Sequence, residues 1–357
     1  MYNRILITGA AGFIGSNLVK YLFSVLVDAV IIGIDNMNDY YDVSLKKYDT
    51  SLKNYDVSLK EYRLNELNNI VPKGIKWKFI KTDISNAKSL NSIFNEYKPQ
   101  IVVNLAAQPG VRYSVENPAA YLESNVVGFF NVIEMCRNYD VKHLIYASSS
   151  SVYGEDTVVP FNEDTTSNMP VSFYATTKKT NELFAHCYSK IYGITMTGLR
   201  FFTVYGPCGR PDMAYFDFTN KILNREHIPL FNYGDNFRDF TYIDDVIYCI
   251  YLIMKDTKID KQPSHKIYNI GSSKSVRMMD FIDILCDELK SSKMIPNDYD
   301  INTYIKLMPK QPVDVSMTCA DMKMFDEDFG FTPTTNIHDG IKKFIKWYIQ
   351  YTKTYKA

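Results

Sequence analysis

A glycine-rich turn near the start of the chain constrains its fold more than any other feature. An apolar run at residues 5–7 precedes a helical pattern, and three glycines separate the two: Gly9, Gly12 and Gly15. The first permits a tight turn, the second close backbone approach to a pyrophosphate, and the third close packing of the helix. Asp35 ends the next apolar run, where an acid can bind ribose hydroxyls. The pattern predicts a dinucleotide-binding turn between a strand and a helix.

Short apolar runs alternate with helical patterns through the first half of the chain. The runs at residues 30–34, 77–80, 101–105 and 143–147 have the length and composition of buried strands. Such alternation predicts the α/β class, with a Rossmann-type doubly wound parallel sheet. Beyond about residue 200, prolines divide the pattern into shorter elements, which predicts a smaller mixed α/β C-terminal lobe. No Gly/Ser-rich linker separates the two parts, so we expect them to share an interface and a ligand cleft.

The charge balance excludes several classes of partner. The chain has 40 basic and 40 acidic side chains and is 46% hydrophobic, which is typical of a globular protein without a surplus for binding nucleic acid. No run of 18 apolar residues predicts a membrane span, and no signal-peptide core is present near residue 1. The six cysteines occur singly, so neither a metal site nor a disulfide framework is expected, and a cytoplasmic location fits best.

A tyrosine and a lysine stand four residues apart on one face of a predicted helix. These are Tyr174 and Lys178, and a serine run at residues 148–151 lies about 25 residues upstream, at the end of a predicted strand. Together with the glycine turn, these motifs resemble the extended short-chain dehydrogenase/reductase family. The resemblance implies that Tyr174 is the general base and acid, that Lys178 lowers its pKa and holds the nicotinamide ribose, and that Ser149 completes the hydrogen-bond network. A free phenol has a pKa of about 10, so positive charge is needed to stabilise the phenolate at neutral pH.

Asp35 also indicates which dinucleotide binds. Its carboxylate would repel a 2′-phosphate, and no arginine follows within ten residues, so NAD rather than NADP is expected. By resemblance, the cofactor contacts the glycine turn, the end of the second strand, the segments after the third and fourth strands, and the Tyr-Lys pair. The implied residues are Gly9, Gly12, Phe13, Ile14, Gly15, Asp35, Asn36, Asp83, Ile84, Leu105, Ala106, Ala107, Gln108, Tyr174 and Lys178.

Longer segments resemble one subgroup of this family, the UDP-glucuronate 4-epimerases. The segments are AAQPGVRYSVENPAAYLESNVVGF, YASSSSVYG, PVSFYATTKKTNELFAHCYS, LRFFTVYGPCGRPDMA and RDFTYIDD. The resemblance implies hydride removal from C4 of a UDP-sugar by bound NAD, rotation of the 4-keto sugar, and hydride return to the opposite face. It also implies a homodimer that pairs the helices over residues 121–135 and 174–189. The implied NAD-binding domain spans residues 1–204 with a returning segment near 238–275, and residues 205–357 mainly bind the UDP-sugar.

A uronate substrate needs partners for its C6 carboxylate. Arg210 could supply a cation, with nearby hydroxyl groups as further donors. By resemblance, Arg238 contacts the diphosphate, and the segment that ends at Asp314 lies near the uridine. The family's usual glycine before that aspartate is Val313 here, which leaves the local turn geometry open. The expected substrate contacts are Arg112, Ser150, Ser151, Thr203, Arg210, Arg238, Gln311 and Asp314.

Several alternatives stay open at this stage. A UDP-glucuronate decarboxylase would share the substrate, because the 4-keto uronate is a β-keto acid that can lose carbon dioxide. A 4-epimerase of a neutral UDP-hexose would need no carboxylate pocket. An NAD-bound regulatory or scaffold protein would lack the catalytic pair, yet Tyr174 and Lys178 are both present. Dehydration is disfavoured, because Ser150 and Ser151 stand where 4,6-dehydratases carry an acidic pair.

A seven-residue phrase repeats three times at residues 41–62, in YDVSLKKYDTSLKNYDVSLKEY. Tyrosine and leucine alternate there at spacings of four and three, which is the apolar seam of a coiled coil. One copy matches the start of the helix after the second strand in the related family, and the other two look like an in-frame expansion. Two interpretations remain: a solvated loop, or an amphipathic helix that packs on its own lobe, on a partner subunit or over the cofactor pocket.

Overall fold

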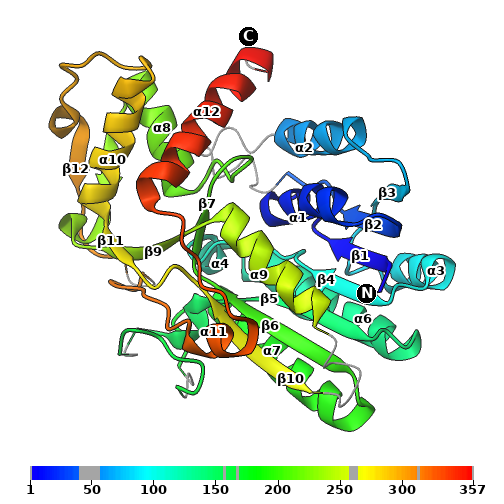
Figure 1. Cartoon of the computed structure of the whole chain (residues 1–357). Coiled ribbons are helices and arrows are strands. Elements are labelled where there is room, and N and C mark those ends of the chain that lie inside the picture. Colours follow the sequence, from blue (N-terminus) through cyan, green and yellow to red (C-terminus); the bar gives the residue numbers. More distant parts are fainter. Residues whose placement is uncertain are drawn as a thin grey trace.

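A parallel sheet forms the centre of the molecule. The computed structural model describes residues 2–39, 57–155, 158–165, 169–256, 264–311 and 314–355. Within these residues, a seven-stranded sheet has the order β10-β6-β5-β4-β1-β2-β3, and all its paired neighbours run parallel. Its strands are β1 (Arg4–Thr8), β2 (Ala29–Asp35), β3 (Ile75–Lys81), β4 (Ile101–Asn104), β5 (His143–Ser149), β6 (Thr195–Phe201) and β10 (His265–Ile270). The predicted Rossmann-type α/β fold is confirmed (Figure 1).

Helices cover both faces of this sheet (Figure 1). One face carries α1 (Phe13–Val25), α2 (Val57–Asn69) and α9 (Ile243–Lys255), and the other carries α3 (Ala87–Tyr97), α6 (Gly128–Asn138) and α7 (Phe173–Tyr192). Alternate side chains of each strand enter two separate apolar clusters, so that Ile5 and Ile7 pack on the α1 side and Leu6 on the α6 side. Burial on both faces explains why these strands are continuous apolar runs in the sequence.

Short elements connect the strands near their carboxyl ends. Between β4 and α6 the chain forms α4 (Tyr113–Glu116), α5 (Pro118–Tyr121) and a π-helical turn (Leu122–Val127). A 3-10 turn (Ser150–Tyr153) follows β5 directly. These segments therefore begin at the same edge of the sheet as the glycine turn.

The later part of the chain shares an apolar cluster with the α1 face of the sheet. Its helices are α8 (Ala214–Asn224), α10 (Met278–Ser291), α11 (Lys323–Phe329) and α12 (Ile337–Tyr355). Two small sheets pair β7 (Thr203–Tyr205), β9 (Phe237–Tyr242) and β11 (Ser275–Arg277), and β8 (Ile228–Leu230) with β12 (Ile305–Leu307). Further 3-10 turns lie at Phe231–Gly234 and Ile301–Tyr304. No helix in the described ranges has the length and apolar character to cross a membrane.

Helix α2 begins inside the third copy of the seven-residue repeat. The first two copies fall in residues 40–56, which lie outside the described part of the chain. Leu59 is only 2% exposed, and the Tyr62 ring meets Tyr351 of α12 edge-on at 5.1 Å between centroids. The Tyr62 hydroxyl also accepts a hydrogen bond from the Trp347 indole N–H at 3.3 Å. The last members of the predicted seam therefore pack into the core of their own chain.

Leu59→Ala should lower the free energy of unfolding by about 2–5 kcal/mol, because it removes a fully buried side chain and leaves a cavity. Glu61→Ala is the matched control on the exposed side of the same helix, and should change that free energy by less than about 0.5 kcal/mol. Urea unfolding followed by circular dichroism measures both variants. Equal effects would contradict the assignment of the repeat's last copy to the core.

Candidate active site

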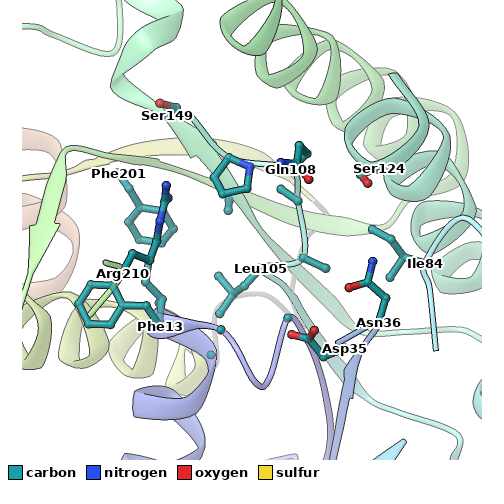
Figure 2. Close-up of a pocket in the computed structure, with 18 of the residues that line it drawn as sticks. Phe13, Asp35, Asn36, Ile84, Leu105, Gln108, Ser124, Ser149, Phe201 and Arg210 are labelled. Atoms are coloured by element: carbon teal, nitrogen blue, oxygen red, sulfur yellow. The ribbon is translucent and has the colours of Figure 1, made fainter. Parts of the chain in front are cut away.

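One pocket opens at the carboxyl ends of the strands, where the strand order reverses between β1 and β4. Doubly wound sheets bind their ligands at this crevice. The pocket encloses about 1360 Å³, including space open to solvent. Figure 2 shows Asp35 at one side and Ser149 and Arg210 at the other. From the expected sites it is lined by Gly9, Gly12, Phe13, Ile14, Gly15, Asp35, Asn36, Asp83, Ile84, Leu105, Ala106, Ala107, Gln108, Ser149, Tyr174, Lys178 and Arg210.

The glycine turn has the geometry that a dinucleotide requires. Gly9 has a φ of +69°, and a Cβ there would lie 2.9 Å from the backbone nitrogen of Ala106, so no larger residue fits without strain. The Gly12 N–H donates to the Gly9 carbonyl oxygen at 2.9 Å, and α1 begins at the next residue. Because glycine provides no side-chain cap, the positive end of α1 is available to bind a pyrophosphate.

Asp35 lies at the end of β2 with a buried cationic partner. Its Oδ1 accepts hydrogen bonds from the Met37 backbone N–H and from the Lys60 ammonium, both at 2.9 Å. Lys60 belongs to α2, lines the pocket and also donates to Asn38 Oδ1 at 3.0 Å. This pair was not expected from the sequence, because only the tyrosines and leucines of the repeat were considered there. The ammonium compensates the carboxylate charge beside the expected ribose position.

Asn36 and Asp83 are in contact beyond the carboxyl ends of β2 and β3. The Asn36 amide donates to Asp83 Oδ2 at 2.7 Å, and the Ser85 backbone N–H donates to Oδ1 at 2.8 Å. Burial alone would raise the pKa of the Asp83 carboxyl, but these hydrogen bonds outweigh it and lower that pKa. Asp83 is therefore held as an acceptor at the pocket wall.

Helix α7 presents the Tyr-Lys pair to the pocket. The Ser172 hydroxyl caps its start by accepting the Ala175 N–H at 3.1 Å. The Lys178 ammonium lies 5.9 Å from the centroid of the Tyr174 ring and donates to the Ala147 carbonyl oxygen at 2.9 Å. Ala147 is on β5, two residues before Ser149, so the pair faces the end of that strand.

Burial shifts the pKa values of both Tyr174 and Lys178. Burial lowers the pKa of Lys178 to about 8. Burial also raises the pKa of Tyr174, although a hydrogen bond with Ser149 and the charge of Arg210 act in the opposite direction. The protein groups alone thus keep the phenol protonated at neutral pH, and further positive charge is needed to make it a base. The nicotinamide ring of NAD supplies such a charge and accepts a hydride.

A buried ion pair fixes α7 to the sheet. Glu182 accepts hydrogen bonds from Arg200 of β6 at 2.8 Å and 2.9 Å, and from the Ser148 hydroxyl at 2.7 Å. Burial would raise the pKa of Glu182, but Arg200 and Ser148 outweigh it, so the carboxyl stays ionised. Glu182 continues the four-residue spacing of Tyr174 and Lys178 along one helix face. That spacing was a signal for its position, and the sequence interpretation missed it.

Arg210 lies in the pocket with an acidic neighbour. Its guanidinium donates to both carboxylate oxygens of Asp212, from Nε at 3.0 Å and from Nη2 at 2.5 Å. The Arg210 backbone N–H donates to the Tyr215 hydroxyl at 3.2 Å. Asp212 was not among the expected site residues, and its bidentate contact holds the arginine in one orientation.

The hydroxyl residues expected beside Arg210 directly follow β5 and begin β7. Ser150 and Ser151 form the start of the 3-10 turn after β5, and the Ser149 hydroxyl accepts from the Ser151 N–H and donates to its hydroxyl, both at 3.2 Å. Thr203 begins β7 and is half-buried. Among the described residues, these three are not part of the pocket lining.

The remaining expected substrate residues form a second cluster. Arg112 donates to Asp314 at 2.6 Å and lies 4.3 Å from the centroid of the Phe231 ring. Burial lowers the pKa of Arg238, while the charge of Asp314 raises it and that of Arg112 lowers it, so the three groups are neighbours. The Gln311 carbonyl oxygen accepts the Asp314 N–H at 3.1 Å. Val313, where the turn geometry was left open, lies outside the described residues.

Comparisons with known proteins identify the family. Residues 5–271 match the model of the NAD dependent epimerase/dehydratase family. Protein CapI of Staphylococcus aureus is 43% identical over 98% of this chain and 99% of its own length. UDP-glucuronate 4-epimerase 4 of Arabidopsis thaliana is 40% identical over 97% of this chain and 75% of its own length. The chain belongs to the NAD-dependent epimerase/dehydratase family.

A solved structure gives the same result at the level of the fold. The chain is similar to UDP-glucuronic acid 4-epimerase from Bacillus cereus, solved with UDP-glucuronic acid and NAD, with a TM-score of 0.82 and 28% identity. The match covers 97% of this chain and 99% of the other. The protein is therefore an enzyme of the isomerase type, and the predictions of the family and of NAD as the cofactor are confirmed.

We expect NAD to copurify with the wild type, and Gly9→Ala should remove most of it, because the new Cβ would push the turn away from Ala106. Gly330→Ala is the matched control: Gly330 also has a left-handed φ, of +66°, but a Cβ there would meet no atom within 4 Å. Both variants place an alanine in the left-handed region, which costs about 1–2 kcal/mol. Only Gly9→Ala also distorts the cofactor turn. The NAD content of each purified variant is measured enzymatically after release by acid. Full retention of NAD in Gly9→Ala would contradict the assignment of this turn to the cofactor.

Proposed function

We propose that the protein catalyses NAD-dependent C4 epimerisation of UDP-glucuronate to UDP-galacturonate. One observation carries the choice of substrate: Arg210 lines the same pocket as Tyr174, and its charge acts on the pKa of that phenol. A cation this close to the reacting group suits a sugar whose C6, two carbons from C4, is a carboxylate. The similarity to UDP-glucuronate 4-epimerases supports the same choice.

In this proposal Tyr174 takes the proton of the C4 hydroxyl as a hydride leaves C4, and Ser149 hydrogen-bonds the same oxygen. Lys178 stabilises the phenolate and holds the nicotinamide ribose. Bound NAD accepts the hydride and returns it, so the cycle needs no external oxidant. The 4-keto sugar rotates between the two transfers and presents its other face, after which Tyr174 gives the proton back.

Control of the carboxylate separates this reaction from its closest rival. The 4-keto uronate loses carbon dioxide when its carboxylate stands perpendicular to the carbonyl plane, which would give UDP-xylose. Asp212 holds Arg210 in a bidentate contact, so the arginine offers a fixed partner that can prevent that orientation. A neutral UDP-hexose carries no carboxylate that could bind Arg210.

We also infer that two parts of the chain bind different ligands. Residues 1–204, with the returning segment near 238–275, would bind NAD, and residues 205–357 would mainly bind the UDP-sugar. The cluster of Arg112, Arg238 and Asp314 supports a diphosphate and uridine site beside the pocket. Six unpaired cysteines in the described residues support a cytoplasmic location.

A homodimer is the expected assembly. Large apolar side chains are exposed on the helices that the family resemblance assigns to the interface: Leu183 is 60% and Ile191 64% exposed on α7, and Phe130 is 43% exposed on α6. Burial of these side chains against a second copy would remove apolar surface from water. The proposed interface is therefore the α6–α7 face of the sheet.

Leu183→Arg should convert the dimer into a monomer, because it places a charge in the centre of the proposed apolar interface. Val27→Arg is the matched control, since Val27 is 85% exposed just after α1 on another face of the molecule. Sedimentation velocity reads the mass of each variant. A wild-type monomer, or an unchanged dimer in Leu183→Arg, would contradict the proposed interface.

The substrate is tested by separate incubation of the purified enzyme with UDP-glucuronate, UDP-glucose and UDP-N-acetylglucosamine, without added NAD, followed by proton NMR. We expect UDP-galacturonate from the first and no product from the other two. UDP-xylose would identify a decarboxylase, and turnover of only the neutral sugars would contradict the role given to Arg210.

Tyr174→Phe is the control for the chemistry. It should lower turnover by at least a hundredfold while NAD and UDP-sugar remain bound, because only the proton transfer is removed. Unchanged turnover in this variant would point to a different base.

A further inference from the structure

A buried arginine on α2 joins the glycine turn to the loop that carries Arg210. Arg63 is 1% exposed. Its Nη1 donates to the Ala11 carbonyl oxygen at 3.1 Å, inside the glycine turn. Its Nε and Nη2 donate to the Cys208 carbonyl oxygen at 3.0 Å and 2.8 Å, and Nη2 also donates to that of Gly209 at 3.0 Å. One guanidinium therefore spans two loops that are far apart in the sequence.

The loop at residues 208–212 has a conformation that its own residues do not favour. Cys208 has a φ of +59°, in the left-handed region that non-glycine residues rarely adopt. A Cβ at Gly209 would lie 2.0 Å from the Tyr215 hydroxyl, so the backbone is pressed against that ring. Such backbone persists only where the surroundings impose it, and it is frequent at functional sites. The Arg63 contacts fall directly on the strained residue and the one after it.

The position of the strain in the loop suggests its purpose. The residue that follows Gly209 is Arg210, whose guanidinium lines the pocket beside Tyr174. A planar guanidinium can hold several carbonyl oxygens at fixed angles, which a lysine ammonium cannot. Burial of such a charge costs more free energy than burial of an apolar side chain in the same space. What the guanidinium adds, and an apolar side chain would not, is a fixed spacing between the two loops.

We propose that Arg63 is a positioning residue for Arg210: it ties the 208–212 loop to the glycine turn, and so sets where the substrate carboxylate binds relative to the cofactor. This inference rests on the proposed function. Lys60, one turn earlier on α2, contacts Asp35 at the other side of the same pocket. Helix α2, which starts in the seven-residue repeat, thus orients both sides of the site.

The test is a double-mutant cycle on the full-length holoenzyme. The proteins are the wild type, Arg63→Met, Arg210→Met and the double variant, with Glu61→Ala as the control on the exposed side of α2. Steady-state kinetics with UDP-glucuronate give KM and kcat separately, and calorimetry gives the affinity for UDP, which has no carboxylate. Thermal melting establishes that each variant is folded.

A positioning role predicts a specific pattern. Arg63→Met should raise the KM for UDP-glucuronate at least tenfold and change the affinity for UDP by less than twofold. In the Arg210→Met background, the same substitution should change KM by less than twofold, because the two residues act through one contact. Equal effects in both backgrounds, or a parallel loss of UDP affinity, would overturn the inference. If Arg63→Met does not fold, Arg63→Lys replaces it, since a single ammonium keeps the charge but cannot span both loops.

A second measurement keeps the inference separate from the proposed function. Hydrogen exchange of the backbone amides of Gly209, Arg210, Asp212 and Met213 should be at least tenfold faster in Arg63→Met than in the wild type and Glu61→Ala, whatever sugar the enzyme uses. Unchanged exchange would overturn the positioning role even if UDP-glucuronate is the substrate. Faster exchange in an enzyme that converts only neutral sugars would support the role of Arg63 in holding the 208–212 loop. It would contradict only the proposed function.

Discussion

The close packing of the glycine turn on the neighbouring strand end is the constraint on which the rest of the site depends. A Cβ at Gly15 would lie 2.2 Å from the Gly9 carbonyl oxygen, and one at Gly9 would contact the backbone at Ala106. Because neither position carries a side chain, the start of α1 reaches the carboxyl edge of the sheet between β1 and β4. Asp35, the last residue of β2, and Tyr174 on α7 can then face one pocket from its two sides.

Buried polar contacts then fix the positions of Tyr174 and Ser149 within that pocket. The Glu182–Arg200 pair fixes α7 to β6, and the Ser148 hydroxyl ties the same carboxylate to β5 next to Ser149. Removal of one partner of such a pair leaves an uncompensated buried charge and costs about 3–5 kcal/mol. The positions of Tyr174 and Ser149 relative to each other are therefore determined by the interior of the protein. In the same way, the buried contacts of Arg63 fix the loop that carries Arg210, the cation proposed to bind the substrate carboxylate.

Short motifs were predictable from the sequence because their backbone conformation and chemistry are local. The glycine turn, the acid after β2 and the Tyr-Lys spacing all carried their own signal, and they led to the fold and the cofactor. Arg63 was missed because nothing local marks an arginine whose partner Cys208 is 145 residues away. Asp212 was also missed, although it lies only two residues from Arg210. Ser150 and Thr203 were expected at the carboxylate, yet the described pocket lining does not include them. Such positions depend on how the segments after the strands pack in three dimensions, which no local pattern in the sequence encodes.

In the proposed reaction a hydride leaves C4 and returns to the same carbon within one closed site. The test incubates UDP-glucuronate deuterated at C4 with the purified enzyme without added NAD, and NMR of the product identifies the epimer and shows whether C4 still carries deuterium. The account predicts UDP-galacturonate that keeps its deuterium at C4, with no loss to solvent. Loss of the deuterium to water would contradict hydride transfer, and its retention in a product that has lost carbon dioxide would contradict epimerisation as the reaction.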